Sequence, residues 1–169
     1  MRITLAVLAV LVLAGCVDRS QTRYYTREPF QTGSVAWAMG TGSNSLTGSA
    51  VFKHGGGEAR PCTDVPVRLV PDSAYARLRL QELFGSELAG TTTGSGFGIY
   101  GPERFDAGWL EAAKTANCGV QGSFAFDSVP DGTWYVVSTW VAWDKDGRGS
   151  TMFKRVDLKG GQAVTINLP

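Results

Sequence analysis

The sequence predicts an all-β protein, an antiparallel β-sandwich of about seven strands with one short helical insertion. Short segments of alternating apolar and polar residues are separated by glycine-, proline- and aspartate-rich turns. Such spacing is typical of sandwich strands joined by hairpins. After residue 15, apolar residues recur with the period of a helix only within residues 73–117. The chain of 169 residues, 43% of them hydrophobic and 18% charged, is long enough for one domain with a real core.

Six segments have the composition or the alternation of strands. The segment 133–143 is apolar on both faces, so we expect it to be the longest and most central strand; the turn Val129-Pro130-Asp131-Gly132 precedes it. A seventh, shorter strand is expected at Ser34 to Met39. The remaining strands are marked by residues that share a face: Ala50 and Phe52; Val65, Val67 and Leu69; Phe124 and Phe126; Met152, Val156 and Leu158, with Lys154 as an exception; and Val164, Ile166 and Leu168.

Two helical pieces are expected inside the insertion 73–117. From Ser73 to Phe84 one face carries Ala76, Leu80, Leu83 and Phe84, while Arg77, Arg79, Gln81 and Glu82 lie mostly outside it. Asp106 has the residue type of an N-cap for a shorter helix to about Lys114, with Trp109, Leu110 and Ala113 inward. Between them, residues 85–101 are rich in glycine and threonine, and we expect a long mobile surface loop.

The first residues form a targeting signal and are not part of the folded domain. Arg2 is followed by an apolar run from Ile3 to Ala14, which is the length of a signal-peptide core and too short to span a membrane. The run ends in Leu13-Ala14-Gly15-Cys16, which resembles the lipobox of bacterial lipoproteins. This resemblance implies a signal peptide at residues 1–15, diacylglycerol and a further acyl chain such as palmitate on Cys16, a tether over 16–45 and a folded domain over 46–169.

The expected location follows from the same resemblance. Residue 17 is Val and not the Asp that retains enterobacterial lipoproteins at the inner membrane, so the periplasmic face of the outer membrane is favoured, although Asp18 weakens that preference. Without Arg2 the mature chain has 15 basic and 15 acidic residues. Because its charge is balanced, we expect the attached lipid to hold it at the membrane and nucleic acid not to be a partner.

The other two cysteines form an even pair in an oxidising compartment. We expect a disulfide between Cys62 and Cys118; the alternative is two buried free thiols. A metal site would need more ligands than these two cysteines and His54, the single histidine, can supply. We therefore predict no metal and no cofactor.

Several segments match a known family pattern. These are residues 46–52 (LTGSAVF), 62–71 (CTDVPVRLVP) and 122–137 (GSFAFDSVPDGTWYVV). Together they resemble the carboxypeptidase-regulatory-like domain, whose fold is a transthyretin-like β-sandwich with an Ig-like arrangement of strands. The resemblance covers residues 46–169 and departs from the family in the insertion 73–117. It implies no catalytic residue, because the family is named for a neighbouring enzyme.

Candidate sites of chemistry are few. His54 has no nucleophile motif near it in sequence. Asp144-Lys145-Asp146-Gly147 begins like a calcium loop, but Arg155 stands where that loop needs a bidentate Glu. The glycine-rich residues 94–98 lack the Lys-Ser/Thr pair of a phosphate loop. The aromatic residues that would stack on a sugar, if exposed, are Trp37, Trp109, Trp134, Trp140 and Trp143.

We therefore expect a non-enzymatic, lipid-anchored protein of the cell envelope with a β-sandwich interaction domain, whose partner is an envelope protein or glycan. The alternative is a carbohydrate-binding module that uses exposed aromatic rings. A third candidate is a carrier of an apolar ligand between the insertion and the sheet. Exposure of the tryptophans and the size of any cavity under the helices separate these hypotheses.

Overall fold

A computed structural model of the chain describes residues 29–53, 59–95, 106–141 and 148–169. Ten strands, two α-helices and a 3-10 helix lie in these ranges. In chain order they are η1 (Thr32–Ala38), β1 (Asn44–Ser49), β2 (Val51–Lys53), β3 (Ala59–Pro61), β4 (Pro66–Pro71), α1 (Ala74–Phe84), β5 (Ala89–Ser95), α2 (Ala107–Glu111), β6 (Lys114–Asn117), β7 (Ser123–Val129), β8 (Gly132–Val141), β9 (Arg148–Leu158) and β10 (Ala163–Asn167).

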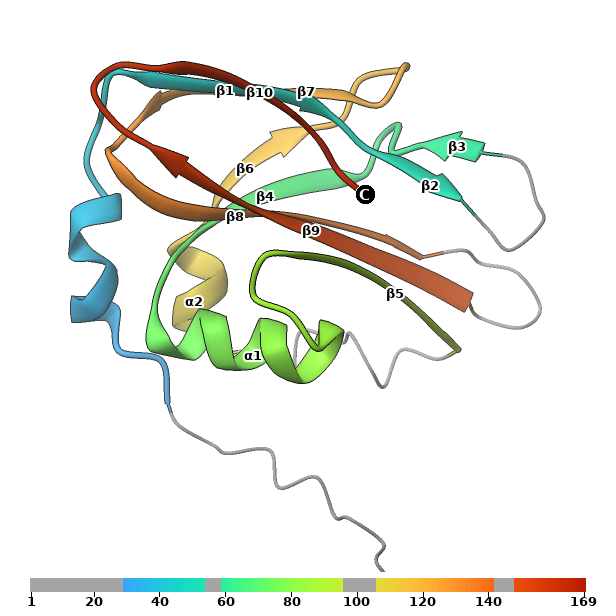
Figure 1. Cartoon of the computed structure of the whole chain (residues 1–169), viewed down its shortest axis with the longest axis horizontal. Coiled ribbons are helices and arrows are strands. Elements are labelled where there is room, and N and C mark those ends of the chain that lie inside the picture. The colour runs from blue at the N-terminus through green and yellow to red at the C-terminus, as the bar shows by residue number, and fades with distance from the viewer. Residues whose placement is uncertain (1–28, 54–58, 96–105, 142–147) are drawn as a thin grey trace, which may run out of the picture.

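The elements stack in three layers (Figure 1). A three-stranded sheet of order β10-β1-β7 faces a five-stranded sheet of order β5-β9-β8-β4-β6, and α1 and α2 lie on the other side of the larger sheet. The predicted β-sandwich is thus confirmed, with more strands than the seven expected. Strand β8 is central in its sheet, as predicted, but β9 is one residue longer than β8.

Among the described strands, the pairing is antiparallel except at one place. Strand β10 runs parallel to β1, with Leu46 opposite Val164 and Gly48 opposite Ile166. This parallel pair departs from the antiparallel pairing that the sequence predicts and that the other described strand pairs follow. Parallel neighbours need a long connection, and here the whole chain from β2 to β9 lies between them.

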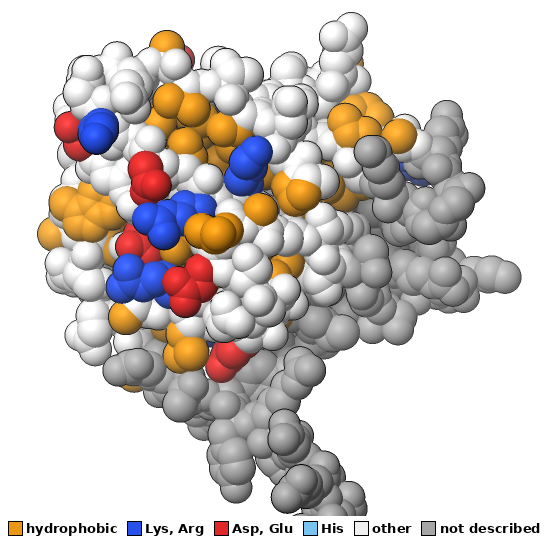
Figure 2. Space-filling view, viewed as in Figure 1, with side chains coloured by type: hydrophobic (Ala, Val, Ile, Leu, Met, Phe, Trp, Pro, Cys, Tyr) orange, Lys and Arg blue, Asp and Glu red, His pale blue; other side chains and the backbone are white. Residues whose placement is uncertain are grey.

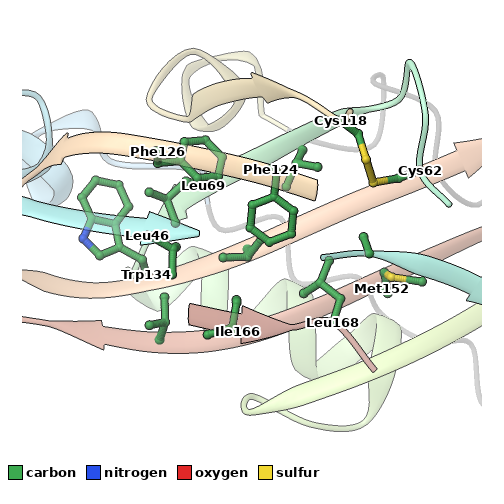
Figure 3. Packing of buried hydrophobic residues seen from close by; sticks show 14 of the residues in the cluster. Leu46, Cys62, Leu69, Cys118, Phe124, Phe126, Trp134, Met152, Ile166 and Leu168 are labelled. Carbon is green, nitrogen blue, oxygen red and sulfur yellow. A yellow bond between two sulfur atoms is a disulfide. The ribbon is translucent and has the colours of Figure 1, made fainter. Parts of the chain in front are cut away.

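The first core fills the space between the two sheets (Figure 3). It is built by residues that alternation had placed on one face, including Phe124, Phe126 and Met152, together with Leu46 and Trp134, which have no exposed surface. The second core lies between the larger sheet and the helices and contains Val70, Tyr135 and Phe153 with Leu80 and Trp109. Strand β8 is apolar on both faces because it serves both cores.

The chain from Pro29 onward packs on the sandwich. Phe30 is buried in the second core. The expected strand at 34–39 is wrong, because residues 32–38 form the 3-10 helix η1, which buries Val35 and Ala38. These two residues are three positions apart, and three residues make one turn of such a helix. In a segment of six residues, the pattern of apolar side chains does not distinguish the two-residue period of a strand from the three-residue period of a 3-10 helix.

The insertion 73–117 contains both predicted helices and two strands that were not predicted. Helix α1 begins after the N-cap Ser73, whose Oγ accepts from the Ala76 N–H at 3.0 Å, and ends at Gly85 with φ of 69°. Helix α2 begins after Asp106, which accepts from the Gly108 N–H at 2.9 Å, and ends before the predicted Lys114. The expectation of a loop over 85–101 is wrong for residues 89–95, which form β5 and pair with β9.

Helix α1 has one charged residue on its buried face. Arg79 was expected outside that face but is 8% exposed, and its guanidinium lies 2.8 Å from the Glu82 carboxylate. Arg79 is three residues after Ala76 and therefore shares the inward side of the helix.

No helix of the described residues is long and apolar enough to cross a membrane.

Candidate functional site

The predicted disulfide is present and lies at the edge of the first core (Figure 3). Cys62 follows β3 and Cys118 follows β6, and both are buried. Their Cα atoms are 5.7 Å apart. The Cys62 N–H also donates to the Ala50 carbonyl at 3.1 Å and the Cys118 N–H to the Val65 carbonyl at 3.3 Å. The bond therefore joins the end of the insertion to the hairpin of β2 and β3.

Of the five tryptophans, the structure describes the side chains of Trp37, Trp109 and Trp134. Trp134 is buried in the first core and donates from Nε1 to the Pro130 carbonyl at 3.1 Å. Trp109 is 4% exposed and lies in the second core. Neither ring is available to a sugar. Trp143 and the side chain of Trp140 lie outside the described residues, as do Cys16, His54 and residues 144–147.

Trp37 is the tryptophan that the described structure exposes, at 39%. Its six-membered ring lies against Gly132, where a β-carbon would overlap it, and it packs on Trp134 in an edge-to-face arrangement with ring centroids 5.1 Å apart. Met39, two residues later, is 63% exposed. The turn before β8 thus supports a fixed aromatic ring at one end of the sandwich, with part of that ring facing solvent.

A pocket of about 50 Å³ lies under the helices. Its floor is the outer face of β4, β8 and β9. Its walls are residues of α1 and α2. The apolar residues around it are Val70, Leu80, Leu83, Phe84, Trp109, Leu110 and Val137.

The floor of the pocket also carries three polar side chains. Arg68 of β4 is opposite Val137 of β8, and Thr139 is opposite Thr151 of β9. The Thr139 and Thr151 hydroxyl oxygens are 3.1 Å apart. Arg68 is partly buried, and no carboxylate pairs with it in the part of the chain that the structure describes. No sequence pattern singles out this arginine, because its place beside the pocket depends on the helices that cover this face of the sheet.

A polar network lies beside the start of α1. The Tyr135 hydroxyl donates to one oxygen of Asp72 at 3.0 Å, and Arg77 pairs with the other at 2.9 Å. Burial, and secondly the charge of Asp72, raise the pKa of the Tyr135 phenol far above its ordinary range. Figure 2 shows acidic and basic side chains interspersed on this face. The network holds α1 to the sheet, and nothing in its geometry marks a nucleophile.

Two further observations concern catalysis and metal binding. Among the residues in the four described ranges, no group of three or more His, Cys, Asp or Glu side chains converges as a metal site would require. Ser138 is fully buried in the first core, and its hydroxyl has no hydrogen-bond partner within the described structure.

Comparisons with known proteins show the fold. No family model and no curated protein matches the chain, so the likeness to the carboxypeptidase-regulatory-like family stays a prediction. A solved structure from Pseudomonas aeruginosa (PA1324), a candidate carbohydrate-binding protein, aligns with a TM-score of 0.61 and 23% identity, over 82% of this chain and 96% of its own. The minor pilin GBS52 of Streptococcus agalactiae aligns with a TM-score of 0.38 and 16% identity, over 75% of this chain and 50% of its own. A DUF3823 family protein from Parabacteroides merdae aligns with a TM-score of 0.35 and 15% identity, over 76% of this chain and 47% of its own.

Proposed function

We propose that the protein is a lipid-anchored, non-catalytic binding protein of the bacterial cell envelope. The observation that carries the proposal is the Cys62–Cys118 disulfide, which closes the edge of the core. Such bonds form and persist outside the reducing cytoplasm. An exported chain with Cys16 directly after a signal-peptide core fits lipid attachment at that thiol, at the periplasmic face of the outer membrane. The sandwich then presents its surfaces to an envelope protein or glycan.

Metabolic labelling with palmitate tests the anchor. We expect the wild-type chain to take up label and to fractionate with the outer membrane, and Cys16→Ser to lose both properties. The matched control is the double variant Cys62→Ala/Cys118→Ala, which removes the other two cysteines and keeps Cys16. Label on Cys16→Ser, or no label on the wild type, would reject the proposed anchor.

Carbohydrate binding is the second candidate, and Trp37 is the observation that favours it. A fixed aromatic ring that faces solvent is the element on which a sugar ring stacks, and Trp37 is held in this way by Gly132 and Trp134. The name of the similarly folded Pseudomonas aeruginosa protein supports the same class of ligand.

Calorimetry with soluble peptidoglycan and polysaccharide fragments tests this candidate. We expect Trp37→Ala to weaken glycan binding at least roughly fivefold, since one stacked ring contributes about 1 kcal/mol or more. Leu88→Ala is the control, because Leu88 is another exposed apolar residue, on a different part of the molecule. Equal binding by both variants would remove Trp37 from the site.

A further inference from the structure

The helix η1 and its C-cap Met39 expose apolar side chains close to the start of the described chain. We propose that the outward face of η1 lies in the headgroup region of the lipid bilayer and orients the domain there. The inference rests on the lipid attachment at Cys16 proposed above and extends it. The acyl chains hold the protein at the membrane, and η1 determines which end of the sandwich faces it.

A three-residue period gives η1 an inward and an outward side. Val35 and Ala38 are buried, and three residues make one turn of this helix. The outward face consists of the exposed residues Ser34, Ala36, Trp37 and Met39. Trp37 is 39% and Met39 63% exposed. Two of the four large apolar side chains that the described structure exposes therefore lie on one short helix.

The segment that carries this face is uncharged. Residues 29–43 contain no Asp, Glu, Lys or Arg, whereas acidic and basic side chains are interspersed on the surface seen in Figure 2. A charged side chain would lose hydration on entering a bilayer. Tryptophan, in contrast, is enriched where lipid meets water, because its ring is apolar and its N–H is polar. The outward face of η1 thus suits the headgroup region.

The charges beside this face are compatible with lipid headgroups. The Lys114 ammonium lies 3.5 Å from the carbonyl of Gly40, which follows Met39 in the chain. A lysine at the rim of an apolar face is attracted to anionic lipids. Asp131 belongs to the turn that supports the Trp37 ring, but its carboxylate accepts hydrogen bonds from an amide and a backbone N–H of the domain. Its charge is therefore already compensated.

The proposed lipid attachment site is close to η1 along the chain. Pro29, the first described residue, comes 13 residues after Cys16. A chain of this length spans at most about 45 Å when fully extended, so an acylated Cys16 keeps η1 near the bilayer. Contact by a tethered group is an intramolecular event with a high effective concentration. A face too small to bind a membrane alone is therefore sufficient.

Site-specific fluorescence on the lipidated full chain tests the proposal. Met39→Cys adds one reactive thiol, because Cys16 is in a thioether and Cys62 is bonded to Cys118. The thiol is labelled with a polarity-sensitive dye, and the protein is reconstituted into vesicles of phosphatidylethanolamine and phosphatidylglycerol that contain a headgroup-spin-labelled lipid. We expect at least about twofold stronger quenching than for Val120→Cys, since an interfacial face enters about 5–10 Å into the headgroup boundary.

Val120→Cys is the matched control. Val120 is also an exposed apolar residue, at 80%, and it lies between β6 and β7 at the end of the sandwich opposite η1 (Figure 1). A second variant adds Trp37→Ser to the Met39→Cys chain. We expect it to lose most of the quenching while circular dichroism shows that the fold is kept, because the interfacial ring is gone.

Flotation of the vesicles separates this inference from the proposed anchor. If the chain floats with the vesicles but the two probe positions are quenched equally, the anchor stands and the inference is overturned. If the chain does not float, both fail. A spectral shift of the Met39→Cys probe with peptidoglycan fragments, without quenching by the lipid, would assign the face to a glycan and overturn the inference. Undiminished quenching in a folded Trp37→Ser variant would also overturn it.

Discussion

At the scale of single residues, the buried side chain of Asn44 connects three segments that are distant in sequence. Its amide donates to the Val129 carbonyl at 2.9 Å and to the Asp131 carboxylate at 2.8 Å, and its oxygen accepts from the Gln162 N–H at 2.8 Å. Asn44 is 1% exposed. The bond from Asn44, and secondly the Gly160 N–H, lower the pKa of Asp131. One amide thus joins β1 to the turns that precede β8 and β10.

We expect Asn44→Ala to lower the free energy of unfolding by about 2 kcal/mol, because it leaves the buried Val129 carbonyl and Gln162 N–H without their partner. Because the pKa of Asp131 is lower in the folded state than in the unfolded chain, the ionised Asp131 carboxylate stabilises the fold at pH values above the ordinary pKa of an aspartate. This stabilisation is lost as pH falls. The variant should therefore lose less stability than the wild type on acidification below pH about 4. Urea unfolding at pH 7 and pH 3 measures both effects, with the exposed Asn117→Ala as control.

Tyr135 is expected to make unfolding depend on alkaline pH. Its phenol has a raised pKa in the folded state, so the native protein holds a proton that the unfolded chain releases above about pH 10. Stability from this group is complete below that pH and falls as pH rises further. Tyr135→Phe should cost about 1 kcal/mol at pH 7 through the lost bond to Asp72. Between pH 9 and 11 its unfolding midpoint should decline less than that of the wild type, and parallel curves would contradict the assignment.

At the scale of elements, β1 depends on a residue without a side chain. Gly48 lies between Phe124 of β7 and Ile166 of β10, and a β-carbon there would overlap the Phe124 ring and the Ile166 carbonyl oxygen. The three strands approach closely because this position is empty. The ring of Phe124 occupies the space and closes the first core over the parallel pair.

We expect Gly48→Ala to destabilise the protein by about 2 kcal/mol, the cost of overpacking a closed position. Gly40→Ala is the matched control, because a β-carbon at Gly40 meets nothing within 4 Å. Thermal unfolding followed by circular dichroism measures the difference. Equal midpoints for the two variants would show that β1 shifts to accept the added methyl group.

At the scale of the whole molecule, one sheet carries two cores. Trp134 and Val136 of β8 face the smaller sheet, while Tyr135 and Val137 face the helices. The disulfide lies at the edge of the first core and spans 56 residues of chain that include α1, β5, α2 and β6. The bond therefore constrains the whole insertion in the unfolded state.

Loss of the disulfide should lower the free energy of unfolding by about 4 kcal/mol, the loop-closure value for this separation. The double variant Cys62→Ala/Cys118→Ala and the reduced wild type should unfold at similar urea concentrations, both below the oxidised protein. Oxidised and reduced protein with the same midpoint would show that the bond contributes nothing to stability.

The sequence by itself determined the elements whose local pattern agrees with their burial. Strands β4, β7, β8, β9 and β10 show alternation or dense β-branched and aromatic residues, and the caps Ser73 and Asp106 mark where both helices begin. The cysteine pair was predictable for the same kind of reason, since composition and compartment decide it. None of these features requires knowledge of a distant neighbour.

Only the tertiary structure decided the rest. The small and polar residues of β5 have no apolar period and become a strand by pairing with β9, and β1 becomes the neighbour of β10 through contacts more than 100 residues apart. The pocket exists only because α1 and α2 cover the outer face of β4, β8 and β9. The physical reason is that alternation reports how one segment is buried, whereas pairing and pockets depend on which other segments come to cover it.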